Sequence, residues 1–179
     1  MVIILAGIHT LEQHLSHFNL KPEAYRPERC PSCGRAGLWI HGSYPRMSDR
    51  VNPSTLSLNH VPIPRFICPH CDKTCSVLPE CIAPRRWFPW PLQQIALALM
   101  ISGCSLRQAC AQMRPSRKTL WRWRKHLQDR FLAHADGLRS RFPALGRHAG
   151  LLDFWQACLA QMSLGEAMRW LHQEGLSMP

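Results

Sequence analysis

The residues of this chain best suited to chemistry are its cysteines, nine among 179 residues. Four of them form two motifs of one type, Cys30-Pro-Ser-Cys33 and Cys68-Pro-His-Cys71. A Cys-x-x-Cys loop directs two sulfurs toward one point, and two such loops complete a tetrahedral Zn²⁺ site. A redox pair would need a βαβ context, which the surrounding sequence lacks. The spacing therefore predicts one zinc ion held by Cys30, Cys33, Cys68 and Cys71.

The predicted metal has a structural role. Four thiolates leave no open coordination position for water, which argues against hydrolytic zinc. A β unit of about 50 residues buries too little apolar area to be stable alone, so metal binding would supply folding energy. The two motifs are 34 residues apart, more than in a compact zinc ribbon, and a long hairpin over 37–67 accounts for the excess.

Three residues near the motifs are weaker ligand candidates. His70 lies in the middle of the second motif, so its side chain is expected to point away from the metal. Cys75 follows in the next predicted strand, where a small buried side chain fits. Cys81 is the main rival ligand. An enzyme with Cys75 or Cys81 as nucleophile is a minor alternative, because no constellation of His and acidic residues stands near either one.

The charge of the chain points to a polyanionic partner. The net charge is +11 and the pI about 9.8, and 18 of the 22 basic residues are Arg. From Cys81 to Gln128 there are nine Arg or Lys and no acidic residue. An evenly solvated surface would mix the two signs, and Arg fits phosphate and the guanine edge with two hydrogen bonds. The distribution predicts nucleic-acid binding.

Residues 92–142 are expected to be helical. Pro91 suits a first helical turn, and an apolar face recurs after it at Leu92, Ile95, Ala96, Leu99 and Met100. Ser105 to Gln108 is a capping box that begins a second helix. Ser116 caps a third helix, whose expected inner face is Leu120, Trp123, Leu127 and Phe131. This order is typical of a three-helix helix-turn-helix domain; an ordinary small helical bundle is the alternative.

The third helix would enter the major groove of duplex DNA. Arg122 and Thr119 are predicted to contact bases, and Arg85, Arg86 and Arg114 to contact phosphates. Trp121 lies off the core spacing, and either DNA or the zinc ribbon could cover it. The predicted DNA-binding residues are Arg117, Lys118, Thr119, Trp121, Arg122, Lys125, Arg114, Arg85 and Arg86.

The expected fold class is α+β, with a small zinc-ribbon β unit, a helix-turn-helix domain and a C-terminal helical hairpin. Strands are expected at 37–44, 58–67 and 74–79, and an amphipathic helix before them with Leu11, Leu15 and Phe18 on one face. The predicted segments are an N-terminal helix and linker at 1–27, the ribbon at 28–80, a linker at 81–91, the helix-turn-helix at 92–142 and the C-terminal segment at 143–179.

The start of the chain has an apolar run of only six residues and no positive charge, so it does not resemble a signal peptide. The longest other apolar stretch, IALALMI, is too short to cross a bilayer. The sequence predicts a cytoplasmic, nucleoid-associated protein with no membrane partner and no small-molecule substrate.

A zinc ribbon followed by a helix-turn-helix resembles the DNA-binding region of bacterial insertion-sequence transposases and their small accessory proteins. The resemblance rests on five stretches: CPSCG at 30–34, HGSYPR at 41–46, RFICPHCDKTCSVLP at 65–79, GCSLRQAC at 103–110 and SRKTLWRW at 116–123. In that group the position of Cys75 is usually aromatic, which implies a core residue.

The resemblance implies a binder of double-stranded DNA and a transposase as partner. A second copy of the chain is another candidate partner, because one helix-turn-helix rarely suffices for specificity. A transposase of this kind continues into a catalytic domain, whereas only five acidic residues follow the basic block here, so no enzyme activity is expected. The alternatives are an autoregulatory transcription factor unrelated to transposition, and RNA binding by the ribbon through Trp39 and Tyr44.

The C-terminal segment carries a pattern of its own. SLGEAMRWL at 163–171 echoes SLRQACAQM at 105–113. A helix that closes the bundle and a half helix-turn-helix, truncated or completed by a partner, are both compatible with the pattern.

Overall fold

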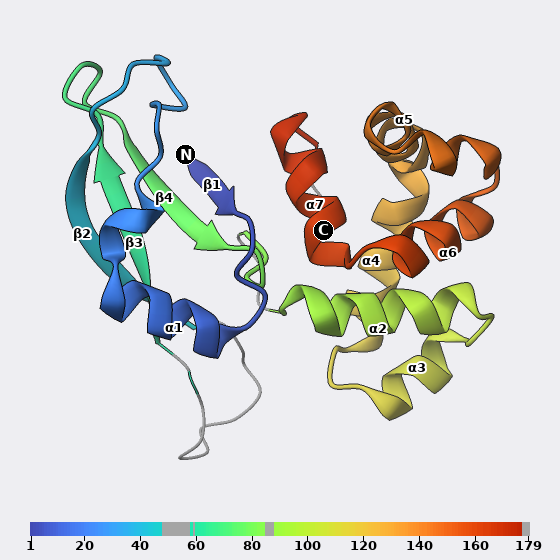
Figure 1. The fold of residues 1–179 in the computed structure, drawn as a ribbon. Helices are drawn as coiled ribbons and strands as arrows, with labels where there is room; N and C mark the ends of the chain where they lie inside the picture. The colour runs from blue at the N-terminus through green and yellow to red at the C-terminus, as the bar shows by residue number, and fades with distance from the viewer. Residues whose placement is uncertain (48–57, 59, 85–87, 177–179) are drawn as a thin grey trace. The chain divides into compact units, whose positions relative to one another are not determined.

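The computed structural model describes residues 1–47, 58, 60–84 and 88–176, and it divides the chain into two compact units, Met1–Pro89 and Trp90–Pro179 (Figure 1). The first unit holds all the β-strands of the described residues, and the second is helical. The α+β class is confirmed.

A four-stranded sheet forms the first unit. Its strands are β1 (Val2–Leu5), β2 (Trp39–Arg46), β3 (Val61–Ile67) and β4 (Thr74–Pro79), in the order β1-β4-β3-β2. The β2-β3-β4 meander is antiparallel, as expected of strands joined in sequence. β1 runs parallel to β4, and this strand was not predicted from the apolar start of the chain. The first residues therefore complete the sheet that carries the cysteine motifs.

Helix α1 (Leu11–Leu20) begins at Thr10 with a reciprocal capping box to Gln13. Its predicted apolar residues Leu11, Leu15 and Phe18 pack against two clusters of buried side chains from the sheet. The fully buried residue of α1 is His14, which the apolar pattern does not reveal. Its Nε2 donates to the Pro62 carbonyl at 2.8 Å, so its Nδ1 accepts from the Tyr25 hydroxyl at 2.7 Å.

The sequence assigns residues 81–83 to a linker, but in the structure they are buried in the first unit. Cys81 and Ile82 join the cluster formed by Val61, Ile63 and Leu78. The core of the first unit therefore extends beyond β4.

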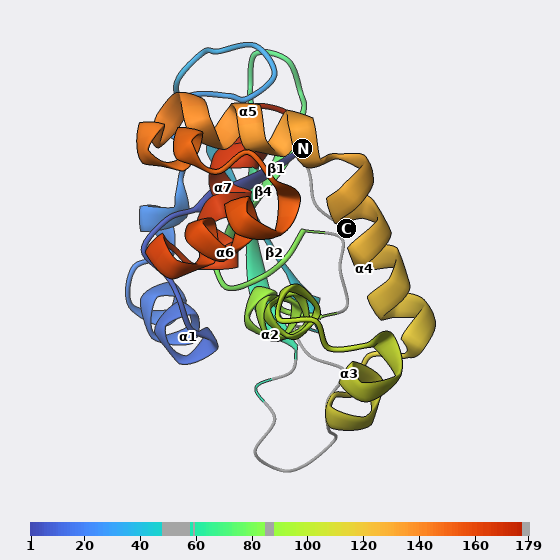
Figure 2. The ribbon, with the colours of Figure 1, turned by 90° about the vertical axis from the view of Figure 1, so that its right-hand side faces the viewer.

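The second unit contains six helices among the described residues. They are α2 (Trp90–Ile101), α3 (Leu106–Gln112), α4 (Arg117–Asp129), α5 (Phe131–Arg141), α6 (Leu151–Gln161) and α7 (Leu164–Gln173). A 3₁₀ turn at Pro143–Arg147 marks the break that the sequence predicts near Pro143. In Figure 2, α4 runs along one side of this unit from α3 to α5.

Two predictions about these helices are wrong. Ile95, expected in the core, is 55% exposed, and α2 instead buries Trp90, Gln93, Ala96 and Leu97. Because α2 is apolar on all sides, its pattern could not decide which face would meet α6 and α7. Phe131 does not extend the third helix, because α4 ends at Asp129; Phe131 begins α5 and packs edge-on against Phe154.

The C-terminal helix α7 closes the bundle. It starts at Ser163, whose hydroxyl accepts from the Glu166 amide, and the Gln94 side chain accepts from the Leu164 amide. Leu164, Ala167, Met168 and Leu171 are buried, and α7 packs against α2 and α5. Its apolar face is thus covered within the unit.

Within the described residues, no helix is both long and apolar enough to cross a membrane.

Candidate metal centre and nucleic-acid interface

The four predicted ligand cysteines come from two loops of the first unit. Cys30 and Cys33 lie in the loop before β2, and Cys68 and Cys71 lie in the turn between β3 and β4. The antiparallel pairing of β2 with β3, with Trp39 opposite Ile67, brings the two loops to the same end of the sheet. The hairpin expected over 37–67 therefore positions the site.

The two cysteine loops share one backbone conformation. In each, the first cysteine carbonyl accepts from the amide four residues on, at Gly34 and Asp72. Its amide donates to the carbonyl five residues on, at Arg35 and Lys73. Gly34 and Asp72 occupy equivalent places with φ of 73° and 54°. Glycine adopts this left-handed region readily, and aspartate is among the few other residues that tolerate it.

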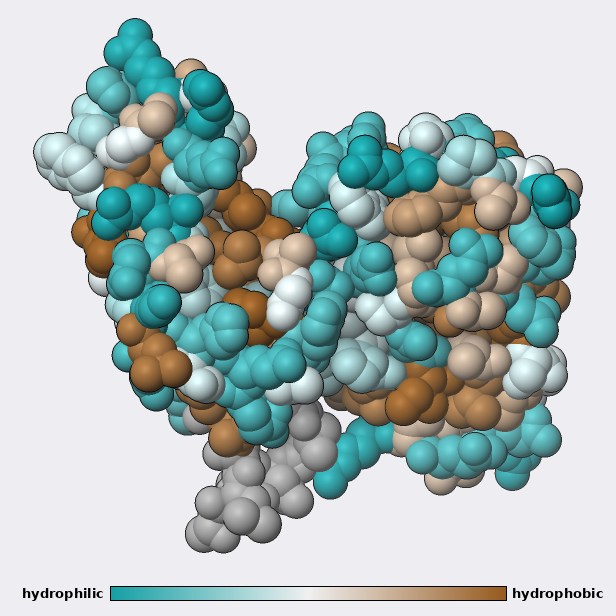
Figure 3. Space-filling view, in the orientation of Figure 1, coloured by the Kyte–Doolittle hydropathy of each residue, from teal (hydrophilic) through white to brown (hydrophobic). Residues whose placement is uncertain are grey.

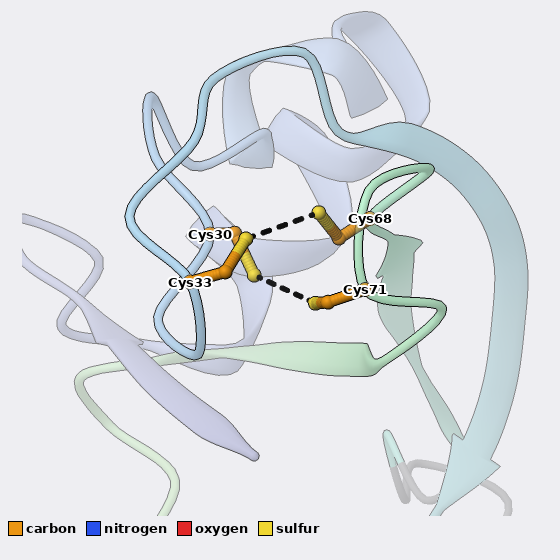
Figure 4. A group of neighbouring side chains, drawn as sticks. All are labelled: Cys30, Cys33, Cys68 and Cys71. Carbon is orange, nitrogen blue, oxygen red and sulfur yellow. Dashed lines mark hydrogen bonds between the residues drawn. The ribbon is translucent and has the colours of Figure 1, made fainter.

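Four sulfurs converge between these loops (Figure 4). The Sγ atoms of Cys30 and Cys71 are 3.7 Å apart, and those of Cys33 and Cys68 are 3.6 Å apart. All four sulfurs lie within 4.8 Å of one another, and all are free thiols. The cluster could hold a metal ion.

The two cysteines of the first loop differ: against the opposing backbone N–H of Arg35, burial and the neighbouring thiols raise the pKa of Cys33 to about 11, whereas the backbone favours an anionic sulfur at Cys30. The backbone N–H groups of Cys33 and Ser32 donate hydrogen bonds to the Cys30 sulfur, and the Ser32 nitrogen is 3.4 Å from it. These donors lower the pKa of the Cys30 thiol to about 6. Hydrogen bonds to the charged form stabilise it, and a metal ligand must be a thiolate.

The neighbouring candidates lie outside the sulfur cluster. His70 is exposed, and its Nδ1 is 3.4 Å from Nη1 of Arg35 on the other loop. This contact joins residues that are 35 positions apart in the sequence, so no local sequence pattern predicts it. Cys75 belongs to the core cluster with Phe66 and Val77, as predicted for a small buried residue. Cys81 is buried in the other cluster, away from the four sulfurs.

The second predicted site lies on α4. Ser116 caps the helix by accepting from the Thr119 amide, and α4 buries Leu120, Trp123 and Leu127 as predicted. α2 and α3 pack against it, and α3 begins with the predicted capping box at Ser105. α2 and α3 therefore hold α4 with one face in the core and the other in solvent.

The outward face of α4 is basic. Residues advance by about 100° around a helix, so Lys118, Arg122 and Lys125 project away from the buried stripe. All three are exposed, as are Arg117 and Trp121, the latter by 51%. Lys125 donates to Asp129 at 2.7 Å one turn later. An exposed pair of this kind contributes little stability, so a phosphate could displace the carboxylate.

The other residues predicted to contact DNA do not lie on the outward face of α4. Thr119 is half-buried, and its hydroxyl lies 3.0 Å from that of Ser116. Arg114 is exposed in the turn between α3 and α4. Arg85 and Arg86 lie outside the described residues.

Together, the fold and the site define a protein in which a β unit with a four-cysteine cluster precedes a helical unit with a basic exposed helix. Residues 30–123, more than half of the chain, match the model of a domain of unknown function, DUF6431, and the chain belongs to this family. The matched stretch includes all four clustered cysteines and α4 as far as Trp123. The chain matches no curated protein and no solved structure.

Proposed function

We propose that this chain is a zinc-stabilised, sequence-specific binder of double-stranded DNA, with no catalytic site of its own. One observation carries the proposal: α4, held by α2 and α3, exposes Lys118, Arg122 and Lys125 on the face opposite its buried stripe. The exposed side of such a helix fits the major groove, where Arg makes paired hydrogen bonds to guanine.

The distances between the sulfurs support zinc as the metal. Tetrahedral coordination with Zn–S near 2.3 Å places the sulfurs about 3.8 Å apart. Two of the sulfur pairs here are 3.6 and 3.7 Å apart and all four sulfurs lie within 4.8 Å of one another; the two measured distances are far beyond the roughly 2 Å of a disulfide. Four cysteine sulfurs are also a usual donor set for structural zinc.

The charges at the start of α4 support an anionic partner. The N-terminus of a helix carries a partial positive charge, which acidic side chains in the first turn usually balance. α4 has no acidic residue in its first turn and instead carries Arg117 and Lys118 there. A DNA phosphate near this end would balance both the helix and the two side chains.

The surroundings of Cys75 and Cys81 argue against a role for either residue as a catalytic nucleophile. Burial raises the pKa of Cys81 to about 12 and also raises the pKa of Cys75. Both side chains are shielded from solvent. A reactive cysteine is accessible and has a lowered pKa, so neither residue suits this role.

The decisive experiment compares two arginines of α4. Arg122 lies on the outward face, whereas Arg124, two residues on, lies about 160° away around the helix. After selection of a cognate site from random duplexes, Arg122→Ala should lower the preference for that site by about 1–3 kcal/mol. Arg124→Ala is the matched control and should keep the preference. A folded Arg122→Ala protein with unchanged preference would show that α4 does not contact the bases.

RNA binding by the first unit is a second candidate, favoured by one observation. Trp39 on the edge strand β2 is 64% exposed, and exposed aromatic side chains stack on unpaired bases. Tyr44 is half-buried against the Val61 cluster and does not suit this role. Competition between duplex DNA and single-stranded RNA, with Trp39→Ala as the variant, separates the two candidates.

As a DNA binder the protein would act on the bacterial chromosome in the cytoplasm. Its resemblance to transposase regions supports a role in a mobile element, as an accessory or regulator beside a transposase. An autoregulatory transcription factor would have the same architecture. A transposase gene next to this one would favour the first role.

A further inference from the structure

One side chain of α4 is unlike the other tryptophans of the helical unit. Trp90, Trp123 and Trp155 are buried and Trp170 is half-buried, whereas Trp121, in the second turn of α4, is 51% exposed. Figure 3 shows apolar side chains scattered among hydrophilic ones on the near face of this unit, so exposure alone marks no site. The charge of its neighbours distinguishes Trp121.

Every residue that lies one turn from Trp121 on the surface of α4 is basic. Arg117 and Lys118 precede it by four and three residues, and Arg124 and Lys125 follow it by three and four. All four side chains are exposed, and no acidic residue of α4 lies within one turn of Trp121. Four cations around an exposed ring favour a polyanion as the occupant of this surface, and the proposed DNA duplex is one.

Trp121 and Arg122 lie on the two sides of the outward face of α4. At about 100° per residue, the line opposite the buried stripe passes close to Lys118, and these two side chains lie about 50° to either side of it. In a major groove that accepts this face of α4, both side chains point toward base edges, and they reach different bases.

We propose that Trp121 recognises thymine, by packing its indole ring against the C5-methyl group of one thymine in the major groove. This inference rests on the proposed function, which places α4 in duplex DNA. Thymine methyl is the apolar group of the base edges in this groove, where the other groups are hydrogen-bond donors and acceptors. An indole ring laid on those polar groups would leave them without partners, whereas contact with the methyl group removes apolar surface from water.

Replacement of thymine by uracil in the DNA tests this contact, because the two bases differ only in the C5-methyl group. In the duplex selected as the cognate site, each thymine is replaced in turn, and the dissociation constant of the full zinc-loaded chain is measured. For the wild type, one replacement should weaken binding roughly fourfold, the effect expected of one buried methyl group. Trp121→Ala should bind the original duplex more weakly than the wild type does and should bind the original and uracil duplexes equally. Trp121→Phe, which keeps an apolar ring, should retain part of the difference.

Leu132→Ala is the matched control. Leu132 is an apolar side chain of the same unit, on α5, and is 71% exposed, so its removal should leave the full preference for thymine over uracil. Circular dichroism confirms that each variant is folded. The proposal is overturned if no uracil replacement weakens binding of the wild type, or if the same replacement weakens the wild type and Trp121→Ala equally.

The fate of Arg122→Ala separates this inference from the proposed function. If Arg122→Ala loses its preference for the cognate site while no uracil replacement matters, α4 contacts bases and only the role of Trp121 is wrong. If Arg122→Ala also keeps its preference, or no cognate site emerges from the selection, the proposed function fails and this inference fails with it.

Discussion

His14 shows how a single buried residue can govern the stability of the first unit. Burial lowers the pKa of His14 below its ordinary value of 6.5, although the Pro62 carbonyl opposes the shift. The neutral ring accepts from Tyr25 and donates to Pro62, so it joins α1 to β3 and to the turn at Pro22–Tyr25. Protonation at Nδ1 would reverse this bond, because the Tyr25 hydroxyl can accept from the ring and donate to the His14 carbonyl, 3.3 Å away; burial of the ring is what disfavours the charged form.

The stability of the first unit should therefore fall as the pH drops below 6.5. In that range the unfolded chain takes up a proton at His14 and the folded chain does not, so the loss continues until the lower folded pKa is reached. Urea unfolding across this range, at constant metal occupancy, measures the effect. His14→Gln should be less stable at neutral pH and show a smaller pH dependence. If the stability of both proteins depended equally on pH, groups other than His14 would be responsible for the pH dependence.

Gly34 allows a second test at the residue scale. Its φ of 73° lies in the left-handed region, and the space around its Cα is open, so a side chain there meets backbone strain without a clash. Gly34→Ala should lower the free energy of unfolding by about 1 kcal/mol. Gly34→Asn should cost less, because the equivalent Asp72 already holds this conformation. Denaturant titration compares the three proteins, and equal stability of wild type and Gly34→Ala would contradict the assignment.

At the level of elements, the start of α4 depends on Ser116. Ser116→Ala removes the acceptor for the Thr119 amide and should cost about 1 kcal/mol of stability. Fraying of the first turn should also weaken binding to a cognate duplex, since Arg117 and Lys118 lie there. Ser116→Asn restores the cap without adding charge and should recover both properties. If Ser116→Ala lost stability and kept full affinity, the first turn would not contact DNA.

The sequence predicts those elements whose signals are local. The two Cys-Pro-x-Cys motifs fix the sulfur cluster, and Ser105 and Ser116 mark the starts of α3 and α4 as the structure has them. The strand β1 escapes prediction because its partner β4 lies about 70 residues away in sequence. The buried face of α2 escapes as well, because it depends on the placement of α6 and α7. Long-range packing decides both.

At the scale of the whole molecule, the two units should respond differently to loss of the metal. The proposed zinc site lies wholly within Met1–Pro89, and the helices of Trp90–Pro179 have their own core. Chelation, or Cys30→Ser, should unfold the first unit and leave most of the helical circular dichroism signal. Cys104→Ser, at a half-buried turn position outside the cluster, should retain one zinc per chain.

Metal analysis and thermal melts followed by circular dichroism check this expectation. The zinc-loaded chain should show two transitions, of which only one shifts when the chelator is added. Loss of all helical signal on chelation would mean that the helical unit does not fold independently of the first unit.

The pairing of β1 with β4 has a consequence for synthesis. β1 leaves the ribosome well before its partner, Thr74–Pro79, which emerges only after most of the first unit has been made. Cys68 and Cys71 emerge before β4, so the fourth sulfur is available before the sheet can close. We therefore expect nascent chains to capture zinc first and to add β1 to the sheet last. Zinc starvation during translation would then leave an apolar strand without a partner.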